Sequence, residues 1–335
     1  MADVAGGRES GVTRIFTKLH NLTESGNFYE AHQLYRTIYF RYLNQKKYDE
    51  LLTVLYSGAT LFLRHDQQVG GADLSILYID VLTKSATPVT NEILDKLPPL
   101  LKLMSPNLAE RETFINKALK WSIADCSTHK SGHPALHRDF AGIFWEEKNY
   151  VLARYHFLHS EDGKSFARML VEIHCCYGYA SEIDLFIAQV VLQYLCLKNR
   201  KSAVDAFQSY TSHHPNIIKG PPFILPLLNF LYFLLKVVRG GQLATFTVLL
   251  ERYEQSIRRD PSYTEYLDKI AQLFFDVPPP PPRRRGILDN LLQSIIMNGN
   301  EFDSDEGESD GPSLLFSSPS CSYVPQRAVE NEDLD

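Results

Sequence analysis

Hydrophobic residues recur at three- and four-residue spacing along most of the chain, which is the pattern of helices with one buried face. A first helix is expected over residues 12–24, and the next one carries its apolar residues on one side, at Ala31, Tyr35, Ile38 and Tyr42. No Asn-Gly or Asp-Gly pair stands between two runs of alternating polar and apolar residues, so hairpins are not expected. The pattern predicts an all-α fold of roughly fourteen helices.

A short unit recurs in this helical pattern. Residues 26–35 and residues 148–157 share the order turn, aromatic, two spacers, Ala, three spacers, aromatic, and residues 47–56 form a degenerate copy. The unit is typical of the second helix of a tetratricopeptide repeat, in which a small Ala lets neighbouring helices approach closely. A strict 34-residue period is missing. The sequence therefore predicts a tetratricopeptide-like α-solenoid of antiparallel helix pairs.

The stretch from Gly220 to Pro282 is expected to hold three helices. The first, Phe223–Leu235, is apolar nearly all round, which suits a helix that is covered on every side. Either more helices of this chain or another protein would cover it. The last begins with Asp260 as N-cap and Pro261 at its first position, where a missing N–H costs nothing.

The acidity of the chain is concentrated at its end. Net charge is −6, and residues 298–335 alone hold ten acidic residues against Arg327. This stretch is poor in periodic apolar residues, so we expect a disordered acidic tail, as we expect disorder over residues 1–9. Between body and tail we expect a Pro/Arg spacer at 278–285 and a terminal amphipathic helix at 286–297. The net charge of −6 argues against a nucleic-acid partner, and the body without the tail is close to neutral and slightly basic.

Cysteine content and hydropathy indicate the compartment. Five cysteines are a sparse and odd set, typical of reduced thiols, and the N-terminal residues have no apolar core of the kind a signal peptide needs. Phe223–Leu235 is the longest apolar run, and it is shorter than the ~20 residues of a membrane-spanning helix. We expect a cytosolic protein with no direct membrane insertion.

One cluster could bind a metal. Cys126, His129, His133 and His137 supply zinc-ligand side chains within a short stretch, but Gly132 and Pro134 interrupt any helix that would bring them together. A loop whose Gly-His-Pro turn starts the next helix is the favoured interpretation, and no metal is expected.

The remaining reactive side chains form no catalytic pattern. Adjacent Cys175 and Cys176 are interpreted as buried thiols, whereas His156, His159 and the segment 213–215 are interpreted as surface residues near turns. No nucleophile elbow, glycine-rich phosphate loop or Ser-His-Asp grouping is present in the sequence. We expect no enzymatic activity and no cofactor.

The segment Pro278–Pro282, followed by three arginines, has two interpretations. It could be a ligand for an SH3-type groove, because such domains bind polyproline helices. A spacer before the last helix is favoured, since many linkers are rich in proline.

Several stretches together resemble the Golgi-to-ER traffic protein 4 family. The specific run is Arg154–Ser160, and further matches lie at residues 29–33, 35–37, 40–42, 56–59, 72–75, 118–122, 132–134, 195–199, 220–223 and 272–275. The resemblance covers roughly Ser10 to Met297. The Pro/Arg spacer is unusual for the family, and residues 313–335 have no match in it.

The resemblance implies a non-enzymatic α-solenoid scaffold that helps deliver tail-anchored membrane proteins to the endoplasmic reticulum. It would bridge the targeting ATPase of that pathway to a BAG-family chaperone regulator, through its C-terminal region, or to a ubiquitin-like adaptor protein. Residues 10–160 would face the ATPase and residues 161–277 would hold the adaptor or regulator.

Candidate contact residues follow from this division. For the ATPase they are Tyr29, Arg36, Arg41, Lys47 and Asp73, which lie on or near polar faces of the first helices. For the adaptor they are Phe230, Tyr232, Phe246, Tyr253, Arg258, Arg259, Tyr263 and Tyr266.

Two other functions stay open at this point. The chain could be a helical-repeat subunit of another cytosolic assembly, of the proteasome-lid or initiation-factor type, although such subunits usually end in a winged-helix module with strands. It could also be a zinc hydrolase that uses the cluster at Cys126, and metal analysis of the purified protein would separate that function from the others.

Overall fold

The computed structural model describes residues 15, 17–123 and 130–279. These residues form a first helical segment over 17–24, the described part of the helix expected at 12–24, then fifteen further α-helices and one 3-10 helix; they contain no strand, which confirms the all-α prediction. The predicted N-terminal segment 1–9, the terminal helix 286–297 and the tail 298–335 lie outside the described residues, and the spacer is described only at Pro278 and Pro279. The helices are α2 (Phe28–Asn44), α3 (Tyr48–Arg64), α4 (Gln68–Lys84), α5 (Asn91–Leu94), α6 (Leu97–Leu103), α7 (Glu110–Ile123), α8 (Pro134–Glu146), α9 (Tyr150–His159), α10 (Gly163–Tyr177), η1 (Ala180–Glu182), α11 (Ile183–Cys196), α12 (Arg200–His213), α13 (Pro226–Gly240), α14 (Leu243–Arg252), α15 (Glu254–Ile257) and α16 (Ser262–Phe275).

One type of turn ends six helices in the described part of the chain. In each, a residue with φ between 49° and 73° is followed by a residue whose N–H donates to the carbonyl five positions earlier, at 2.9–3.0 Å. These are Schellman turns, which satisfy the last carbonyls of a helix and reverse the chain within a few residues. The left-handed residues are Gly26, Lys46, Asp66, Ala86, Lys148 and Lys198.

Three of the helices that follow these turns start alike. Asn27, Asn149 and Asn199 each accept a hydrogen bond in their side chain from the backbone N–H three residues on, which caps the new helix. Four residues after each of these asparagines stands a fully buried alanine, at Ala31, Ala153 and Ala203. The small alanine at this position confirms the tetratricopeptide-like interpretation. The copy at Asn199 was missed in the sequence because no aromatic residue follows it directly.

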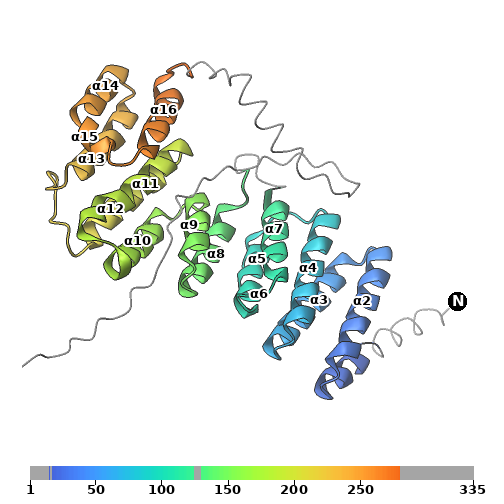
Figure 1. Cartoon of the computed structure of the whole chain (residues 1–335). Helices are drawn as coiled ribbons and strands as arrows, with labels where there is room; N and C mark the ends of the chain where they lie inside the picture. The colour runs from blue at the N-terminus through green and yellow to red at the C-terminus, as the bar shows by residue number, and fades with distance from the viewer. Residues whose placement is uncertain (1–14, 16, 124–129, 280–335) are drawn as a thin grey trace, which may run out of the picture. The chain divides into compact units, whose positions relative to one another are not determined.

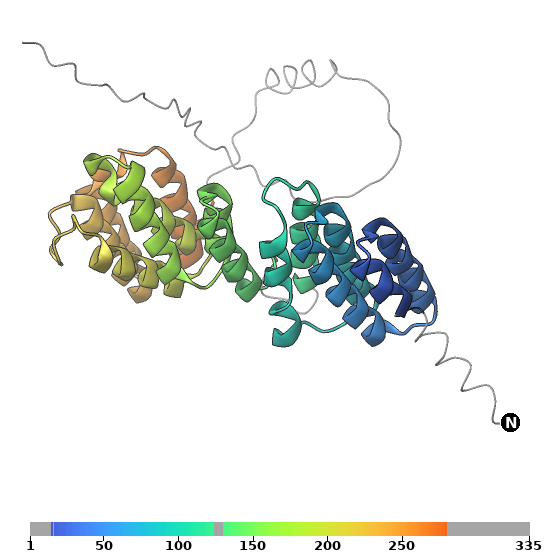
Figure 2. The same cartoon turned by 90° about the horizontal axis from the view of Figure 1, so that it is seen from below.

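The helices pack in chain order into one continuous hydrophobic core. Figures 1 and 2 show them following one another from the blue α2 to the orange α16. In the first part α2 contacts α3, α3 contacts α4, and α4 contacts α7. In the second part α11 packs against α10, α12, α13 and α16. The division predicted after residue 160 falls between α9 and α10, which contact each other.

The structure corrects the prediction for the apolar stretch 223–235. Helix α13 begins at Pro226, and within the stretch Ile224 and Phe233 stay exposed, so it is not covered on every side. Its apolar side is covered by α11, α12, α14 and α15 of the same chain. Asn229 also fixes the chain before the helix: its amide accepts from the N–H of Phe223 at 2.8 Å and donates to the carbonyl of Phe223 at 2.6 Å. Most of this stretch therefore needs no partner to cover it.

Candidate interaction surfaces

Helix α2 carries an exposed aromatic and basic stripe. Its buried face packs on α3 and α4, so Tyr29, Arg36 and Phe40, seven and then four residues apart, turn to solvent. Tyr29 is 77% exposed and Phe40 is 57% exposed, and Arg41 is exposed beside them. Large aromatic side chains at such exposure are typical of protein contact surfaces. Phe40 is missing from the predicted contact residues, although an aromatic residue on the polar side of the helix was a signal for it.

Three of the predicted ATPase-facing residues, Arg36, Lys47 and Asp73, form ion pairs within the chain. Asp73 on α4 lies 2.8 Å from Nε2 of His32 and 3.9 Å from Nε of Arg36, both on α2. The hydrogen bond from His32, helped by the charge of Arg36, lowers the pKa of Asp73. Lys47 forms an exposed ion pair with Glu50 at 3.0 Å. Asp73 therefore positions Arg36 on this surface, and His32 is a member of the group that the sequence did not reveal.

The C-terminal prediction needs correction for three aromatic residues. Phe230, Phe246 and Tyr263 are at most 2% exposed, so they belong to the core and offer no surface to a partner. The ring of Phe246 stacks on that of Phe275 at 4.7 Å. Helices that pack from far along the chain cover these rings, and helical spacing alone does not show which apolar residues will be covered.

The other predicted adaptor residues keep some exposure. Tyr232, Tyr253 and Tyr266 are half buried, and the side chain of Arg258 is 76% exposed. Arg259 is tied to the body instead: its guanidinium donates to Asp184 at 2.6 Å and to the carbonyl of Ser181 at 2.7 Å. The structure therefore leaves three tyrosines and Arg258 as the accessible members of this predicted set.

A groove of about 630 Å³ lies between α12 and α13. Apolar side chains contribute to it, including Phe207, Phe223, Tyr232 and Leu235, and basic side chains line it as well, namely Arg200, Lys201, Lys236 and Arg239. The ammonium group of Lys236 lies 4.2 Å from the centre of the Tyr232 ring. Of the predicted adaptor residues, Tyr232 alone lines this groove.

The run Arg154–Ser160, the most specific part of the resemblance, lies where α9 meets the second half. Arg154 donates to Gln193 on α11 at 3.3 Å, and Gln193 in turn donates to the hydroxyl of Tyr266 on α16 at 3.1 Å. The buried hydroxyl of Tyr194 donates to the carbonyl of Phe157 at 2.8 Å. Burial lowers the pKa of Arg154 and raises that of Tyr194. This run therefore joins α9 to α11 and α16.

The histidines predicted as surface residues are largely buried. His156 is buried and its Nδ1 lies 2.9 Å from Nδ1 of the buried His137, whose Nε2 lies 3.1 Å from the carbonyl of Ser131. His159 is half buried and its ring stacks on that of His137. Burial lowers the pKa of His137 to about 4 and that of His156 to about 3. Both rings are therefore neutral near pH 7.

The described residues do not assemble Cys126, His129, His133 and His137, the cluster weighed as a metal site, into one. Cys126 and His129 lie outside them, and His137 points its ring nitrogens at His156 and at a carbonyl. Cys175 and Cys176 were predicted to be buried, and both are exposed at the end of α10. Among the described residues, no helix is both long enough and apolar enough to span a bilayer.

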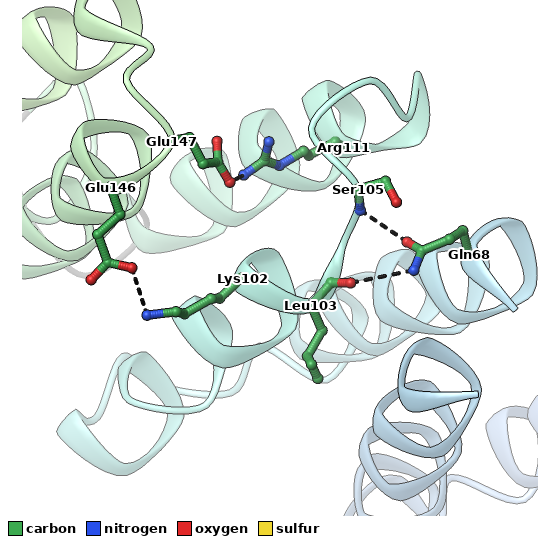
Figure 3. Close-up of polar contacts among 7 residues, drawn as sticks. All are labelled: Gln68, Lys102, Leu103, Ser105, Arg111, Glu146 and Glu147. Carbon is green, nitrogen blue, oxygen red and sulfur yellow. Dashed lines mark hydrogen bonds and ion pairs between the residues drawn. The ribbon is translucent and has the colours of Figure 1, made fainter. Parts of the chain in front are cut away.

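A polar cluster ties four helices together midway along the chain (Figure 3). Lys102 on α6 pairs with Glu146 on α8 at 2.6 Å, and Arg111 on α7 pairs with Glu147, which ends α8, at 2.5 Å. Gln68 on α4 accepts from the N–H of Ser105 at 2.9 Å and donates to the carbonyl of Leu103 at 3.4 Å. This cluster fixes the α6–α7 connection against α4 and α8.

The stacked helices, local turns and exposed surfaces define a helical-repeat protein of the scaffold class. The family model described as Golgi to ER traffic protein 4 matches residues 45–296, and the chain belongs to this family. The human Golgi to ER traffic protein 4 homolog is 51% identical over 308 residues, which cover 91% of this chain and 94% of the human protein. The Oryzias latipes homolog is 52% identical over 297 residues, 88% of this chain and 91% of its own length. The crystal structure of Get4 from C. therm. superposes with a TM-score of 0.75 at 25% identity, covering 88% of this chain and 100% of the other.

Proposed function

We propose that this protein is a cytosolic, non-enzymatic scaffold in the delivery of tail-anchored membrane proteins to the endoplasmic reticulum. It bridges the targeting ATPase of that pathway to a BAG-family chaperone regulator or a ubiquitin-like adaptor. Membership of the Golgi to ER traffic protein 4 family supports the pathway. The observation that carries the bridging role is the presence of two accessible aromatic and basic surfaces on separate sets of helices, one on α2 and one on α12 and α13.

The ATPase contact is assigned to the α2 surface, with Tyr29, Arg36, Phe40 and Arg41 as its accessible members and Asp73 holding Arg36 in place. Lys47 lies just beyond the helix and adds charge at the rim. Exposed charges of this kind act mainly on the association rate and its salt dependence, whereas exposed aromatic rings supply most of the binding free energy.

The regulator or adaptor contact is assigned to the groove between α12 and α13, together with Tyr253, Arg258 and Tyr266. Tyr232 lies in the groove and its ring is held by Lys236, so it can present an apolar face at little cost in side-chain entropy. Phe233, which is 44% exposed on the same helix, extends this apolar surface.

The proposal is tested by separating the two contacts in the full-length protein. Arg41→Glu should weaken binding of the purified targeting ATPase roughly three- to tenfold at low salt, corresponding to ~0.6–1.4 kcal/mol, and less at high salt. Phe40→Ala should weaken it at least tenfold at both salt concentrations. Arg168→Glu, an exposed charge reversal on α10, is the matched control and should change neither binding partner.

Tyr232→Ala should weaken binding of the C-terminal region of the BAG-family regulator and leave ATPase binding unchanged. Titration calorimetry measures each pair, and gel filtration of all three proteins shows whether both partners occupy one chain at once. Competition between the two partners for the chain, or ATPase binding that tolerates both Arg41→Glu and Phe40→Ala, would rule out the bridging arrangement proposed here.

A further inference from the structure

Two buried imidazoles face each other where α10 and α12 end. His174 on α10 and His214, which follows α12, are each 3% exposed, and Nδ1 of His174 lies 2.9 Å from Nε2 of His214. Nε2 of His174 lies 2.9 Å from the carbonyl of Tyr179, and Nδ1 of His214 accepts from the N–H of Asn216 at 3.2 Å. These neighbours determine which ring nitrogen of each histidine carries the proton. His174 donates through Nε2 and presents a lone pair at Nδ1, and His214 points its Nε2–H at that lone pair.

A thiol stands beside this pair. Cys175 follows His174 on α10 and is exposed, and its sulfur and the two ring nitrogens all lie within 4.8 Å of one another. The His174 ring packs closely against Gly178: a Cβ added to this glycine would lie 2.6 Å from the ring, so only glycine leaves room for it. Two imidazole nitrogens and a thiol are the ligand types that Zn²⁺ prefers, and the exposed thiol gives the ion a path from solvent.

We propose that His174, Cys175 and His214 form a Zn²⁺ site, with Nδ1, Sγ and Nε2 as ligands and the fourth position open to water. Tetrahedral zinc has Zn–N distances of about 2.0–2.1 Å and a Zn–S distance of about 2.3 Å, which place nitrogens about 3.3 Å apart and nitrogen and sulfur about 3.6 Å apart. The two nitrogens need to separate by about 0.4 Å. The sulfur needs to move by up to about 1.2 Å, within the freedom of an exposed side chain.

The protonation changes balance with one proton released. Cys175 binds as the thiolate, and its proton passes to solvent. His214 remains a neutral imidazole: the proton on Nε2 leaves and Nδ1 is protonated, so the 3.2 Å hydrogen bond from Asn216 is lost. His174 keeps its Nε2–H on the carbonyl of Tyr179, the second-shell bond that orients many zinc-bound histidines.

The proposed site lies between two elements of the fold. It joins the end of α10 to the segment after α12, two elements that otherwise meet here through the imidazole–imidazole hydrogen bond. Zinc binding would replace that bond with three metal–ligand bonds, two from α10 and one from His214, and so stabilise the contact between these elements. The site is made by side chains of this chain alone, whichever partners the protein binds.

The experiment uses the full-length protein, reduced and freed of metal by a chelator, and Co²⁺ as a spectroscopic probe for Zn²⁺. We expect one Co²⁺ per chain, a thiolate-to-cobalt charge-transfer band in the near ultraviolet, and displacement of the cobalt by Zn²⁺. Cys175→Ser should abolish the band and weaken Zn²⁺ binding at least ~100-fold, since even second-shell changes cost 10–100-fold. Zn²⁺ should also raise the melting temperature of the wild-type protein and not that of this variant.

Cys176→Ser is the matched control, because Cys176 is the adjacent and equally exposed thiol. It should retain both the cobalt band and the zinc affinity. His214→Gln should lose the affinity, with circular dichroism confirming that the helices are intact. The proposal is overturned if the wild-type protein shows no thiolate band, or if the band survives Cys175→Ser and disappears on substitution of another cysteine.

Discussion

The ion pair between Arg111 and Glu147 allows a sharp test of what holds the middle of the chain together. The side chain of Arg111 is 5% exposed and that of Glu147 is 20% exposed. Arg111 also packs its guanidinium 5.2 Å from the centre of the Phe144 ring, and its buried Nε has no hydrogen-bond partner among the described residues. Glu147→Ala would therefore leave a buried cation without its counter-charge.

The adjacent pair supplies the matched control. Lys102 and Glu146 lie at a similar distance, but their side chains are 61% and 64% exposed (Figure 3). Removing one partner of a buried pair typically costs ~3–5 kcal/mol, and we expect about 3 kcal/mol for Glu147→Ala because water reaches part of Glu147. An exposed pair is worth ~0–1 kcal/mol, so Glu146→Ala should change stability by less than about 1 kcal/mol. Both glutamates end α8, so effects of the helix dipole largely cancel in the comparison.

The assay is urea unfolding followed by far-ultraviolet circular dichroism, with amide hydrogen exchange to locate the loss. A protein built of stacked helices can unfold in parts, so exchange should accelerate most in α7 and α8 of the Glu147→Ala protein. The double variant Arg111→Met/Glu147→Met should recover most of the stability, because an apolar pair removes the unpaired charge. Equal destabilisation by Glu146→Ala and Glu147→Ala would refute the reasoning, since burial would then not decide the effect.

Two further changes test the turns and the buried histidines. Lys198→Gly should stabilise the protein by up to ~1 kcal/mol, because glycine adopts the φ of 59° without strain. Its control, Lys269→Gly within α16, should destabilise the protein by about 1 kcal/mol. The midpoints of urea unfolding measure both changes, and equal effects would contradict the turn assignment. The folded-state pKa of about 4 for His137 lies below the unfolded value, so the unfolded state binds more protons at mildly acidic pH and stability should fall as the pH drops from about 6.5 toward 4. The lowered pKa of His137 alone should reduce the free energy of unfolding by about 2 kcal/mol at pH 5, and its neighbour His156 acts in the same direction. Free energies of unfolding that stay constant between pH 7 and pH 5 would show that these rings are not buried as neutral groups.

The helices and their turns were predictable because their causes are local. Apolar spacing and the small alanine at Ala31 and Ala153 act within one or two helical turns, and the structure confirms both; the caps made by Asn27 and Asn149 are equally local, although they were not predicted. The third copy, at Asn199 and Ala203, uses the same turn without the aromatic residue and was missed for that reason.

Burial was harder to predict because it depends on partners far along the sequence. His214 was interpreted as a surface residue, yet its partner His174 lies 40 positions away, and the exposed Cys175 was interpreted as buried. Phe230 and Phe246 were predicted to contact an adaptor, whereas helices of the same chain cover them. An aromatic residue at helical spacing indicates a packed face, but the sequence alone does not say whether the packing is within the chain or with a partner.

The position of α16 against α11 has a consequence for synthesis. Helix α11 buries nine of its residues, and two of its polar side chains have partners in or near α16. Asp184 pairs with Arg259, which comes just before α16, and Gln193 donates a hydrogen bond to Tyr266. At ~5–20 residues per second, the ribosome needs on the order of 4–16 s to proceed from Cys196 to Phe275. The local turns allow each earlier helix pair to form as it emerges, because their contacts are close in sequence. During those seconds the side of α11 that packs on α16 stays exposed on the nascent chain, and this surface is where a chaperone would be needed most.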